Sequence, residues 1–331
     1  MKYFSKNSNS MILVGVWANR NWILGNWIKE VQLRHPKSFK LWWLPSIYAG
    51  KRFIEKIIVF PIPRATAYFF SYPTIFRFYL EKFPLKFSNN SLVLYPHNEP
   101  EMGNLKEQVK LLNQAYKVYF YCKQDSENLR SLGLVESKIV IANCAVDNDC
   151  ILDNKVIRDQ NTVVLASKFG PRKGAELLPD IVKRLKDWNF ILMGRGWDEF
   201  LRQSKLLKLS NLNYVKFNKP NRTKFFSKAK IFLSLSNLEG GPVPLIESMS
   251  LGVIPISTNT GFAPEFIRNG VNGFLLPIHP SVDLVESRIR SVDILTENPE
   301  VSVSHLTWDR ITKITLTDLV RIRNNSIFKT N

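Results

Sequence analysis

The sequence predicts an α/β protein with two Rossmann-like, doubly wound parallel-sheet domains that face a central cleft. The chain has 331 residues, which is too long for one compact core and fits two domains. Short runs rich in Val, Ile and Leu alternate with amphipathic helical patterns, in two successive series. Such near-continuous apolar runs are typical of strands that helices cover on both faces, so each series predicts a parallel sheet between helices.

Each series contains six predicted strands. They lie at residues 11–17, 39–44, 56–60, 92–95, 118–122 and 139–142 in the first series, and at 162–167, 190–193, 214–217, 231–235, 253–257 and 274–276 in the second. The polar stretch 147–160 separates the two series and is the predicted linker. We therefore expect one domain at residues 1–148 and a second at 149–304. A helical pattern within residues 305–331 is expected to cross back to the first domain.

The charge of the chain indicates an anionic partner. Hydrophobic residues make up 45% and charged residues 22%, as in a folded globular protein, but the formal net charge is +18. Residues 1–99 hold 14 Lys and Arg against 4 Asp and Glu, so they alone carry +10. A nucleoside diphosphate, an anionic lipid surface and nucleic acid all fit this excess.

The three cysteines and the apolar stretches indicate a cytoplasmic location. The odd number of cysteines, without a C-x-x-C pair or other metal-ligand spacing, indicates reduced thiols, and Cys122 and Cys144 lie in apolar runs typical of a core. The most apolar stretch, residues 65–80, is interrupted by Pro73 and Arg77 and is shorter than the roughly 20 residues of a membrane span. Residues 11–18 fit a buried strand better than a signal peptide.

The strongest motif lies at residues 237–252. A predicted buried strand is followed by Gly240 and Gly241, which permit a tight turn and a close approach of the backbone to a ligand. A helix then begins near Pro244 and ends near Gly252. The amino end of a helix placed in this way is a site for an anion.

This motif resembles the GT-B glycosyltransferases of family 4, also called group 1. The resemblance lies in Glu239 and Glu247, separated by seven residues, and in the apolar run 253–257 after them. Residues 168–174 and 261–275 are similar to other parts of the same family. The resemblance covers residues 163–277 well and 126–147 more loosely, and in residues 1–115 it is limited to the architecture.

The resemblance implies roles for two carboxylates and two lysines. Glu247 would bind the ribose hydroxyls of a nucleotide-sugar donor, and Glu239 would be a catalytic residue that hydrogen-bonds the transferred sugar. Lys168 and Lys173 would bind the diphosphate, where the family usually has Arg and Lys. Lys supplies the same charge without the bidentate fork of Arg. The alternative is that all four are ordinary surface charges.

The resemblance also assigns two glycine loops to donor binding. The backbone around Gly240, Gly241 and Val243 would meet the diphosphate. Gly194 and Gly196 follow a predicted strand and would form a loop that approaches the donor closely. A G-x-G without a third glycine is weak evidence for a dinucleotide site, so a plain turn is the alternative.

No cofactor and no metal are expected. Asp147 and Asp149 form a D-x-D pattern, which can bind a metal, but that motif belongs to a different transferase fold. Here it lies in the predicted linker, where we expect a solvated loop.

The first domain is expected to contribute His97 and the acceptor site. His97 follows the strand 92–95, where family members often place a catalytic His; a packing or capping role is the alternative. Arg20, Trp22 and Gly25 follow the first strand and are the candidate acceptor residues. The aromatic and basic stretch 42–86 fits either a membrane-facing acceptor surface or an ordinary core with a basic face.

The resemblance thus implies a retaining glycosyltransferase for glycan or glycolipid biosynthesis. Its partners would be a nucleoside-diphosphate sugar, a glycan or lipid-linked acceptor, and an anionic membrane surface. A GT-B sugar-nucleotide epimerase or a phosphorylase-like enzyme would share the architecture. A basic nucleic-acid-binding protein is the alternative from another class, but no helix-turn-helix, zinc or RNA-binding signature accompanies the charge, so we expect no nucleic-acid partner.

Overall fold

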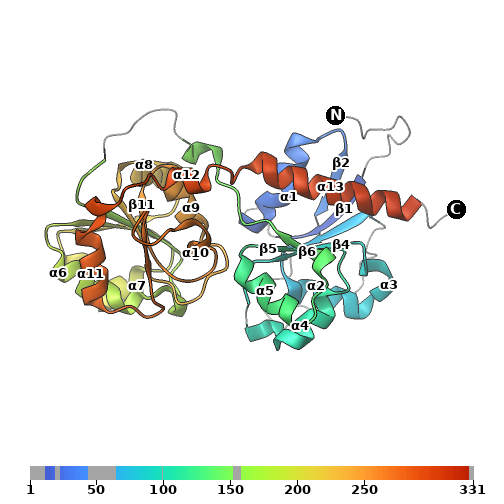
Figure 1. Ribbon diagram of the computed structural model, residues 1–331, viewed down its shortest axis with the longest axis horizontal. Helices are drawn as coiled ribbons and strands as arrows, with labels where there is room; N and C mark the ends of the chain where they lie inside the picture. The colour runs from blue at the N-terminus through green and yellow to red at the C-terminus, as the bar shows by residue number, and fades with distance from the viewer. Residues whose placement is uncertain (1–11, 19–22, 44–64, 99, 152–157, 328–331) are drawn as a thin grey trace. The chain divides into compact units, whose positions relative to one another are not determined.

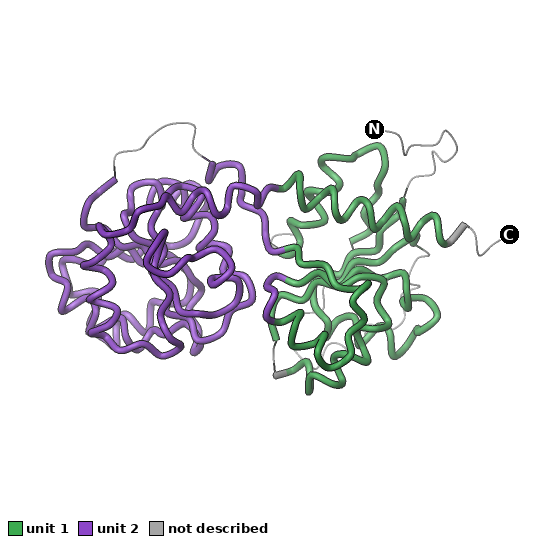
Figure 2. The backbone as a smooth tube through the Cα atoms, in the orientation of Figure 1, with its two compact units in different colours: residues 1–120, 125–142, 308–331 green, residues 121–124, 143–307 purple. Residues whose placement is uncertain are grey.

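The computed structural model describes residues 12–18, 23–43, 65–98, 100–151 and 158–327. These residues form two compact units (Figure 2). Unit 1 contains residues 1–120, 125–142 and 308–331, and unit 2 contains residues 121–124 and 143–307. The chain passes from one unit to the other between Ala142 and Asn143, where the sequence pattern placed a boundary at residue 148.

Unit 1 is a six-stranded parallel sheet with helices around it (Figure 1). The strand order is β2-β1-β3-β4-β5-β6. The strands are β1 (Ile12–Trp17), β2 (Phe39–Trp43), β3 (Ala67–Phe70), β4 (Ser91–Tyr95), β5 (Lys117–Phe120) and β6 (Ile139–Ile141). The α-helices are α1 (Ile23–Arg34), α2 (Pro73–Lys82), α3 (Pro84–Phe87), α4 (Leu105–Leu112), α5 (Lys123–Ser131) and α13 (Trp308–Ile327).

The last helix, α13, packs on unit 1 through buried polar contacts. The indole N–H of Trp27 donates a hydrogen bond to Thr315 Oγ1 (2.9 Å). The hydroxyl of Tyr119 donates to Asp318 Oδ2 (2.7 Å). Since buried polar groups need partners, these two bonds fix the register of α13 against α1 and β5.

Unit 2 repeats the same architecture with the strand order β12-β11-β10-β7-β8-β9, again all parallel. The strands are β7 (Thr162–Ala166), β8 (Asn189–Gly194), β9 (Leu212–Lys216), β10 (Ile231–Ser234), β11 (Ile254–Thr258) and β12 (Phe274–Leu276). The α-helices are α6 (Leu178–Arg184), α7 (Asp198–Gln203), α8 (Lys219–Lys228), α9 (Val243–Ser250), α10 (Ala263–Phe266), α11 (Val282–Arg290) and α12 (Glu300–Val303).

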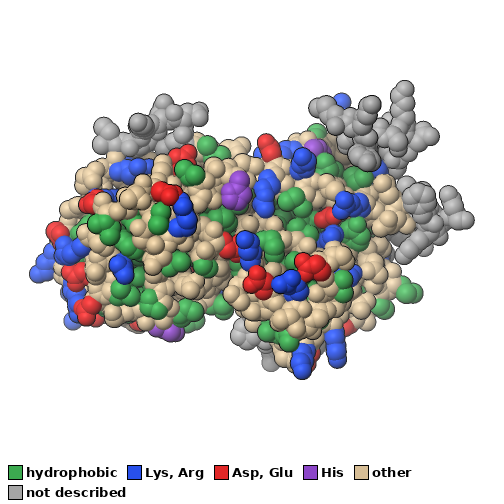
Figure 3. Space-filling view, viewed as in Figure 1, with side chains coloured by type: hydrophobic (Ala, Val, Ile, Leu, Met, Phe, Trp, Pro, Cys, Tyr) green, Lys and Arg blue, Asp and Glu red, His purple; other side chains and the backbone are tan. Residues whose placement is uncertain are grey.

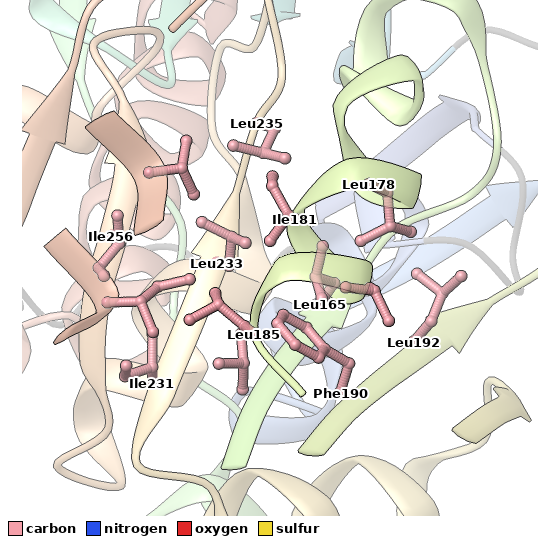
Figure 4. Packing of buried hydrophobic residues seen from close by; sticks show 14 of the residues in the cluster. Leu165, Leu178, Ile181, Leu185, Phe190, Leu192, Ile231, Leu233, Leu235 and Ile256 are labelled. Carbon is pink, nitrogen blue, oxygen red and sulfur yellow. The ribbon is translucent and has the colours of Figure 1, made fainter. Parts of the chain in front are cut away.

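Apolar side chains from neighbouring strands and helices build the core of unit 2 (Figure 4). Leu165 of β7, Leu233 of β10, Ile256 of β11 and Ile181 of α6 belong to one cluster and are all buried. These are the apolar runs that the sequence identifies as strands, and their burial explains why the runs contain so few polar residues. The prediction of two doubly wound parallel-sheet domains is confirmed.

Unit 1 contains a strand that the sequence analysis did not predict. The predicted strand at 56–60 lies outside the described residues, and the sheet instead has β3 between β1 and β4. Phe69 and Phe70 of β3 are fully buried, and Tyr72 is 6% exposed. These aromatic side chains therefore belong to the core, and a membrane-facing surface over all of residues 42–86 is wrong.

Candidate functional site

The order of the strands in unit 2 creates a switch point between β7 and β10. From β7 the chain moves outward through β8 and β9, whereas from β10 it moves outward in the other direction through β11 and β12. In open parallel sheets, ligands bind beyond the carboxyl ends of the strands at such a point. The candidate donor residues of unit 2 are found on the loops that follow these strands.

Backbone hydrogen bonds hold these loops together. The N–H of Phe169, after β7, donates to the carbonyl of Arg195, after β8 (2.9 Å). The N–H of Asn237, after β10, donates to the carbonyl of Arg172, after β7 (2.8 Å). The three loops therefore form one connected surface at the switch point.

The structure brings Lys173 and Glu239 together at this surface. Lys173 ends a short 3₁₀ helix, Pro171–Lys173, and Glu239 lies on the loop between β10 and α9. Lys173 Nζ donates a hydrogen bond to Glu239 Oε1, and the two side chains are 15% and 10% exposed. Lys168 lies on the loop after β7 and is exposed. The site thus contains one ion pair, between Lys173 and Glu239, and a second lysine, Lys168, on the loop that also carries Lys173.

The amino end of α9 opens on the same loop. Gly240 and Gly241 precede Pro242, the residue that caps α9, and Val243 is the first residue of the helix. The backbone amides of a first helical turn favour an anion. The N–H of Phe262 donates to the carbonyl of Gly240 (3.0 Å), which ties this turn to the loop after β11. Backbone and side-chain positive charge can therefore act together here.

Two of the candidate glycines are required by neighbouring protein atoms. A Cβ on Gly194 would lie 1.9 Å from the carbonyl oxygen of Ser167. A Cβ on Gly241 would lie 2.7 Å from the ring of Phe262 and 2.8 Å from the ring of Tyr121. The sequence analysis explained these glycines by the approach of a ligand, whereas the structure shows that close packing of the loops already requires them. Gly196 has φ of +79°, a conformation that favours glycine.

Glu247, which the resemblance assigns to the ribose hydroxyls of a donor, is buried among protein atoms in the structure. It lies in α9 and is 3% exposed. Its Oε1 accepts a hydrogen bond from Arg222 Nη1 (2.5 Å), and the Arg222 side chain is itself 4% exposed. Burial raises the pKa of Glu247 to about 8, because the lowering by Arg222 is smaller than the rise from desolvation.

The same guanidinium binds the D-x-D pair, whose loop remains partly solvated as predicted, with Asp147 18% and Asp149 42% exposed. Arg222 Nη2 donates to Asp149 Oδ1 (2.5 Å) and Arg222 Nη1 to Asp147 Oδ2 (3.3 Å). Lys219 Nζ also pairs with Asp147 (2.9 Å). Asp147 and Asp149 raise the pKa of Glu247 further. We call Arg222, Lys219, Glu247, Asp147 and Asp149 the Arg222 cluster.

The sequence analysis missed Arg222. It lies in α8, a helix whose pattern is mostly polar, and nothing in its immediate neighbours distinguishes it from a surface arginine. The available signal was indirect: Glu247 falls in an apolar helix, where a carboxylate is buried and needs a cation as its partner.

The cysteines are core residues, as expected. Cys122, Cys144 and Cys150 are 2%, 5% and 0% exposed. Burial raises the pKa of the Cys144 and Cys150 thiols well above the ordinary value, which disfavours the reactive thiolate. Within the described ranges, no three His, Cys, Asp or Glu side chains are grouped so that they could hold a metal ion.

The candidate residues of unit 1 are placed in part. His97 follows β4 directly, is 7% exposed, and lies beside Asn98, whose Oδ1 accepts a hydrogen bond from Gln108 (2.9 Å). Arg20 and Trp22 lie outside the described residues. Gly25 is the third residue of α1 and is buried, so it belongs to a helix and not to a loop. None of the helices that the structure describes has the length and apolar character of a membrane span.

The comparisons with known proteins agree with this architecture. Residues 151–300 match the family described as glycosyl transferases group 1. Proteins of Methanocaldococcus jannaschii and Haemophilus influenzae, both described as uncharacterized glycosyltransferases, are each 25% identical, over 163 and 171 residues. These matches cover 46% and 49% of this chain. They span about half of the relatives' own length, 46% and 47%.

Solved structures extend the likeness to almost the whole chain. HepE of Anabaena in complex with UDP-glucose has a TM-score of 0.72 at 14% identity, covering 94% of this chain and 100% of that one. Sucrose-phosphate synthase of Thermosynechococcus elongatus has a TM-score of 0.75 at 13% identity, covering 97% and 100%. The lipopolysaccharide outer core galactosyltransferase WaaB has a TM-score of 0.64 at 13% identity, covering 97% and 100%. The two parallel six-stranded sheets and the likeness to these structures show that this chain has the GT-B fold, and residues 151–300 of its second unit match the glycosyl transferases group 1 family.

Proposed function

We propose that the protein is a retaining glycosyltransferase that moves a sugar from a nucleoside-diphosphate sugar to an acceptor hydroxyl in glycan or glycolipid biosynthesis. The observation that carries this proposal is the meeting of Lys173, Glu239 and the amino end of α9 at the switch point of the family-matched unit. HepE, which shares the fold, has been solved with UDP-glucose and with UDP, and this supports a nucleotide sugar as the donor.

The proposed reaction needs positively charged protein groups beside the leaving diphosphate and a negatively charged group beside the sugar. The bond between the anomeric carbon and the diphosphate oxygen breaks, and a bond from that carbon to the acceptor oxygen forms. Lys168, Lys173 and the N–H groups of α9 would stabilise the leaving diphosphate. Glu239 would stabilise the oxocarbenium-like sugar. In front-side attack, which gives retention, the acceptor proton passes to the leaving phosphate oxygen.

The test is an assay with UDP-, GDP- and ADP-sugars that detects the free nucleoside diphosphate, followed by NMR of the product's anomeric proton. Release of the diphosphate with the donor's anomeric configuration kept in the product supports the proposal. A new epimer of the sugar would instead identify an epimerase, and turnover that requires inorganic phosphate a phosphorylase-like enzyme. Tight binding of an oligonucleotide, with no turnover of any donor, would identify a nucleic-acid-binding protein.

We expect the transfer to need no metal ion and no other cofactor. Two lysines and a helix amino end already supply positive charge near the proposed diphosphate position. Turnover measured in excess EDTA should therefore stay within about twofold of the untreated rate, a difference of less than about 0.5 kcal/mol in the barrier. Loss of turnover that magnesium or manganese restores would contradict this expectation.

We also propose that the protein is cytoplasmic and binds peripherally to the inner face of the membrane through an apolar tip on unit 1. The tip lies between α2 and α3, where Phe83 is 39% and Leu85 is 96% exposed, and Lys82 and Lys86 flank them. Apolar side chains between lysines fit an anionic lipid surface, which they enter while the ammonium groups meet the headgroups. On the face seen in Figure 3, basic and acidic side chains are interspersed, so that face shows no broad basic patch that could bind an anionic membrane in place of the tip.

This proposal predicts that Leu85→Asp weakens sedimentation with vesicles that contain anionic lipid. The wild-type protein should bind such vesicles more than neutral ones, and less at high ionic strength, because salt screens the attraction. Leu207→Asp is the matched control, since Leu207 is 56% exposed in unit 2. Equal recovery of wild-type protein with neutral and anionic vesicles would refute the membrane proposal, and equal loss of binding in both variants would refute the tip.

A further inference from the structure

The ion pair at the switch point joins Lys173 and Glu239. In the proposed function, these two residues bind different parts of the donor. Lys173 would bind the diphosphate and Glu239 the transferred sugar, yet in the structure they bind each other. Each side chain therefore has a partner on the protein that a donor would have to replace or share.

Both ends of this pair are held by the fold. The loop that carries Lys173 is bound to the end of β10 through the Asn237–Arg172 backbone hydrogen bond (2.8 Å). The N–H of Glu239 donates to Thr260 Oγ1 (3.0 Å), which fixes the other partner against the loop after β11. The backbones on both sides are thus fixed independently of the ion pair, so the contact can open by rotation of the two side chains.

A diphosphate bound at Lys173 would be penalised by Glu239. The carboxylate neutralises the ammonium group, and it would also lie close to the negative phosphate oxygens. With the side chains only 15% and 10% exposed, water screens this repulsion less than at an open surface. A free nucleoside diphosphate lacks the transferred sugar, so it has no sugar hydroxyls that could donate hydrogen bonds to the displaced carboxylate. An intact donor has sugar hydroxyls, which can donate hydrogen bonds to it.

We propose that Glu239 is a specificity-determining residue that competes with the diphosphate for Lys173 and so favours the intact nucleotide sugar over the free nucleoside diphosphate. This inference rests on the proposed function. Once the sugar has been transferred, the Glu239 carboxylate loses its sugar partners and returns to Lys173. The return of the ion pair weakens the hold on the product and speeds its release.

The experiment is calorimetric titration of the full chain with UDP, GDP and ADP and with the corresponding sugar nucleotides. In Glu239→Gln the free diphosphate should bind about three- to tenfold more tightly than in wild type, the range expected for removing one partly buried competing charge. The preference for the sugar nucleotide over the free diphosphate should fall by at least the same factor. Glu239→Ser, which also removes the charge, serves as a second variant, and melting curves verify that each variant is folded.

Two controls separate the ion pair from a general change of charge. In a Lys173→Met background, Glu239→Gln should tighten binding of the free diphosphate clearly less than it does in the wild-type background, since only the direct repulsion between carboxylate and phosphate is left to remove. Glu286→Gln makes the same charge change in α11, where Glu286 pairs with Arg184 and Arg290, and should leave the affinity unchanged.

Three results would overturn the inference. Unchanged or weaker diphosphate binding by folded Glu239→Gln, in a protein that transfers sugar, refutes the competition and leaves the proposed function standing. Equal tightening in the Lys173→Met background assigns the effect to direct repulsion by Glu239 and not to competition for Lys173, and equal tightening in Glu286→Gln assigns it to net charge. If wild type neither binds a nucleoside diphosphate nor turns over a donor, the proposed function fails, and the inference fails with it.

Discussion

Glu239→Gln is expected to lower kcat by roughly two orders of magnitude or more, which corresponds to about 3 kcal/mol of lost transition-state stabilisation. The substitution keeps the size of the side chain and removes its charge. A carboxylate beside the reacting sugar interacts more strongly once the sugar gains positive charge, so the loss should appear in kcat and kcat/KM together. The tighter binding of product proposed above adds to the fall in kcat, because product release also becomes slower.

Single-turnover and steady-state rates separate these two effects. The chemical step measured in a single turnover should be slow in Glu239→Gln, with the melting temperature close to that of wild type, since Glu239 lies on a loop and its side chain has no part in the apolar core. Glu286→Gln is again the matched control and should retain the wild-type rate. If a folded Glu239→Gln protein keeps the wild-type kcat, Glu239 is not a catalytic residue, and the proposed reaction loses its main support.

The fold could be predicted largely because its sheets are buried on both faces. The runs of Val, Ile and Leu at 162–167 and 231–235 match β7 and β10 within one residue at either end. The strand β3 escaped prediction because it contains aromatic residues in place of β-branched ones, and it is followed closely by the aromatic helix α2. An apolar run of this kind does not distinguish a strand from a buried helix.

The candidate site was less predictable, because its electrostatics depend on residues far apart in the sequence. Lys173 and Glu239 could each be selected from their motif, but their ion pair joins positions 66 residues apart. Glu247 was selected from its spacing to Glu239, and that spacing carries no information on Arg222. An arginine in a polar helix is expected to be exposed. Arg222 is buried because its guanidinium contacts Glu247 of α9 and Asp149 of the predicted linker, and neither contact can be predicted from α8 alone.

Arg222→Met is expected to lower the free energy of unfolding by about 3 kcal/mol, the range seen when one partner of a buried ion pair is removed. The substitution keeps an unbranched side chain of similar length and leaves Glu247, Asp147 and Asp149 without the guanidinium that all three share. Loss of the guanidinium removes the main effect that lowers the pKa of Glu247, so burial then favours the neutral carboxyl, and this relieves part of the cost. In a domain of this size, the change corresponds to a fall in the melting temperature of roughly 6–12 °C.

Two further variants test whether the loss comes from the buried carboxylate. Arg184→Met removes an arginine that is 48% exposed and paired with Asp283 and Glu286, so it should destabilise the protein far less than Arg222→Met does. Adding Glu247→Gln to Arg222→Met should restore part of the lost stability, because a neutral side chain no longer needs the guanidinium. Chemical denaturation of the three proteins measures these differences directly. If Arg222→Met is no less stable than Arg184→Met, the Arg222 cluster does not hold α8, α9 and the start of the linker together.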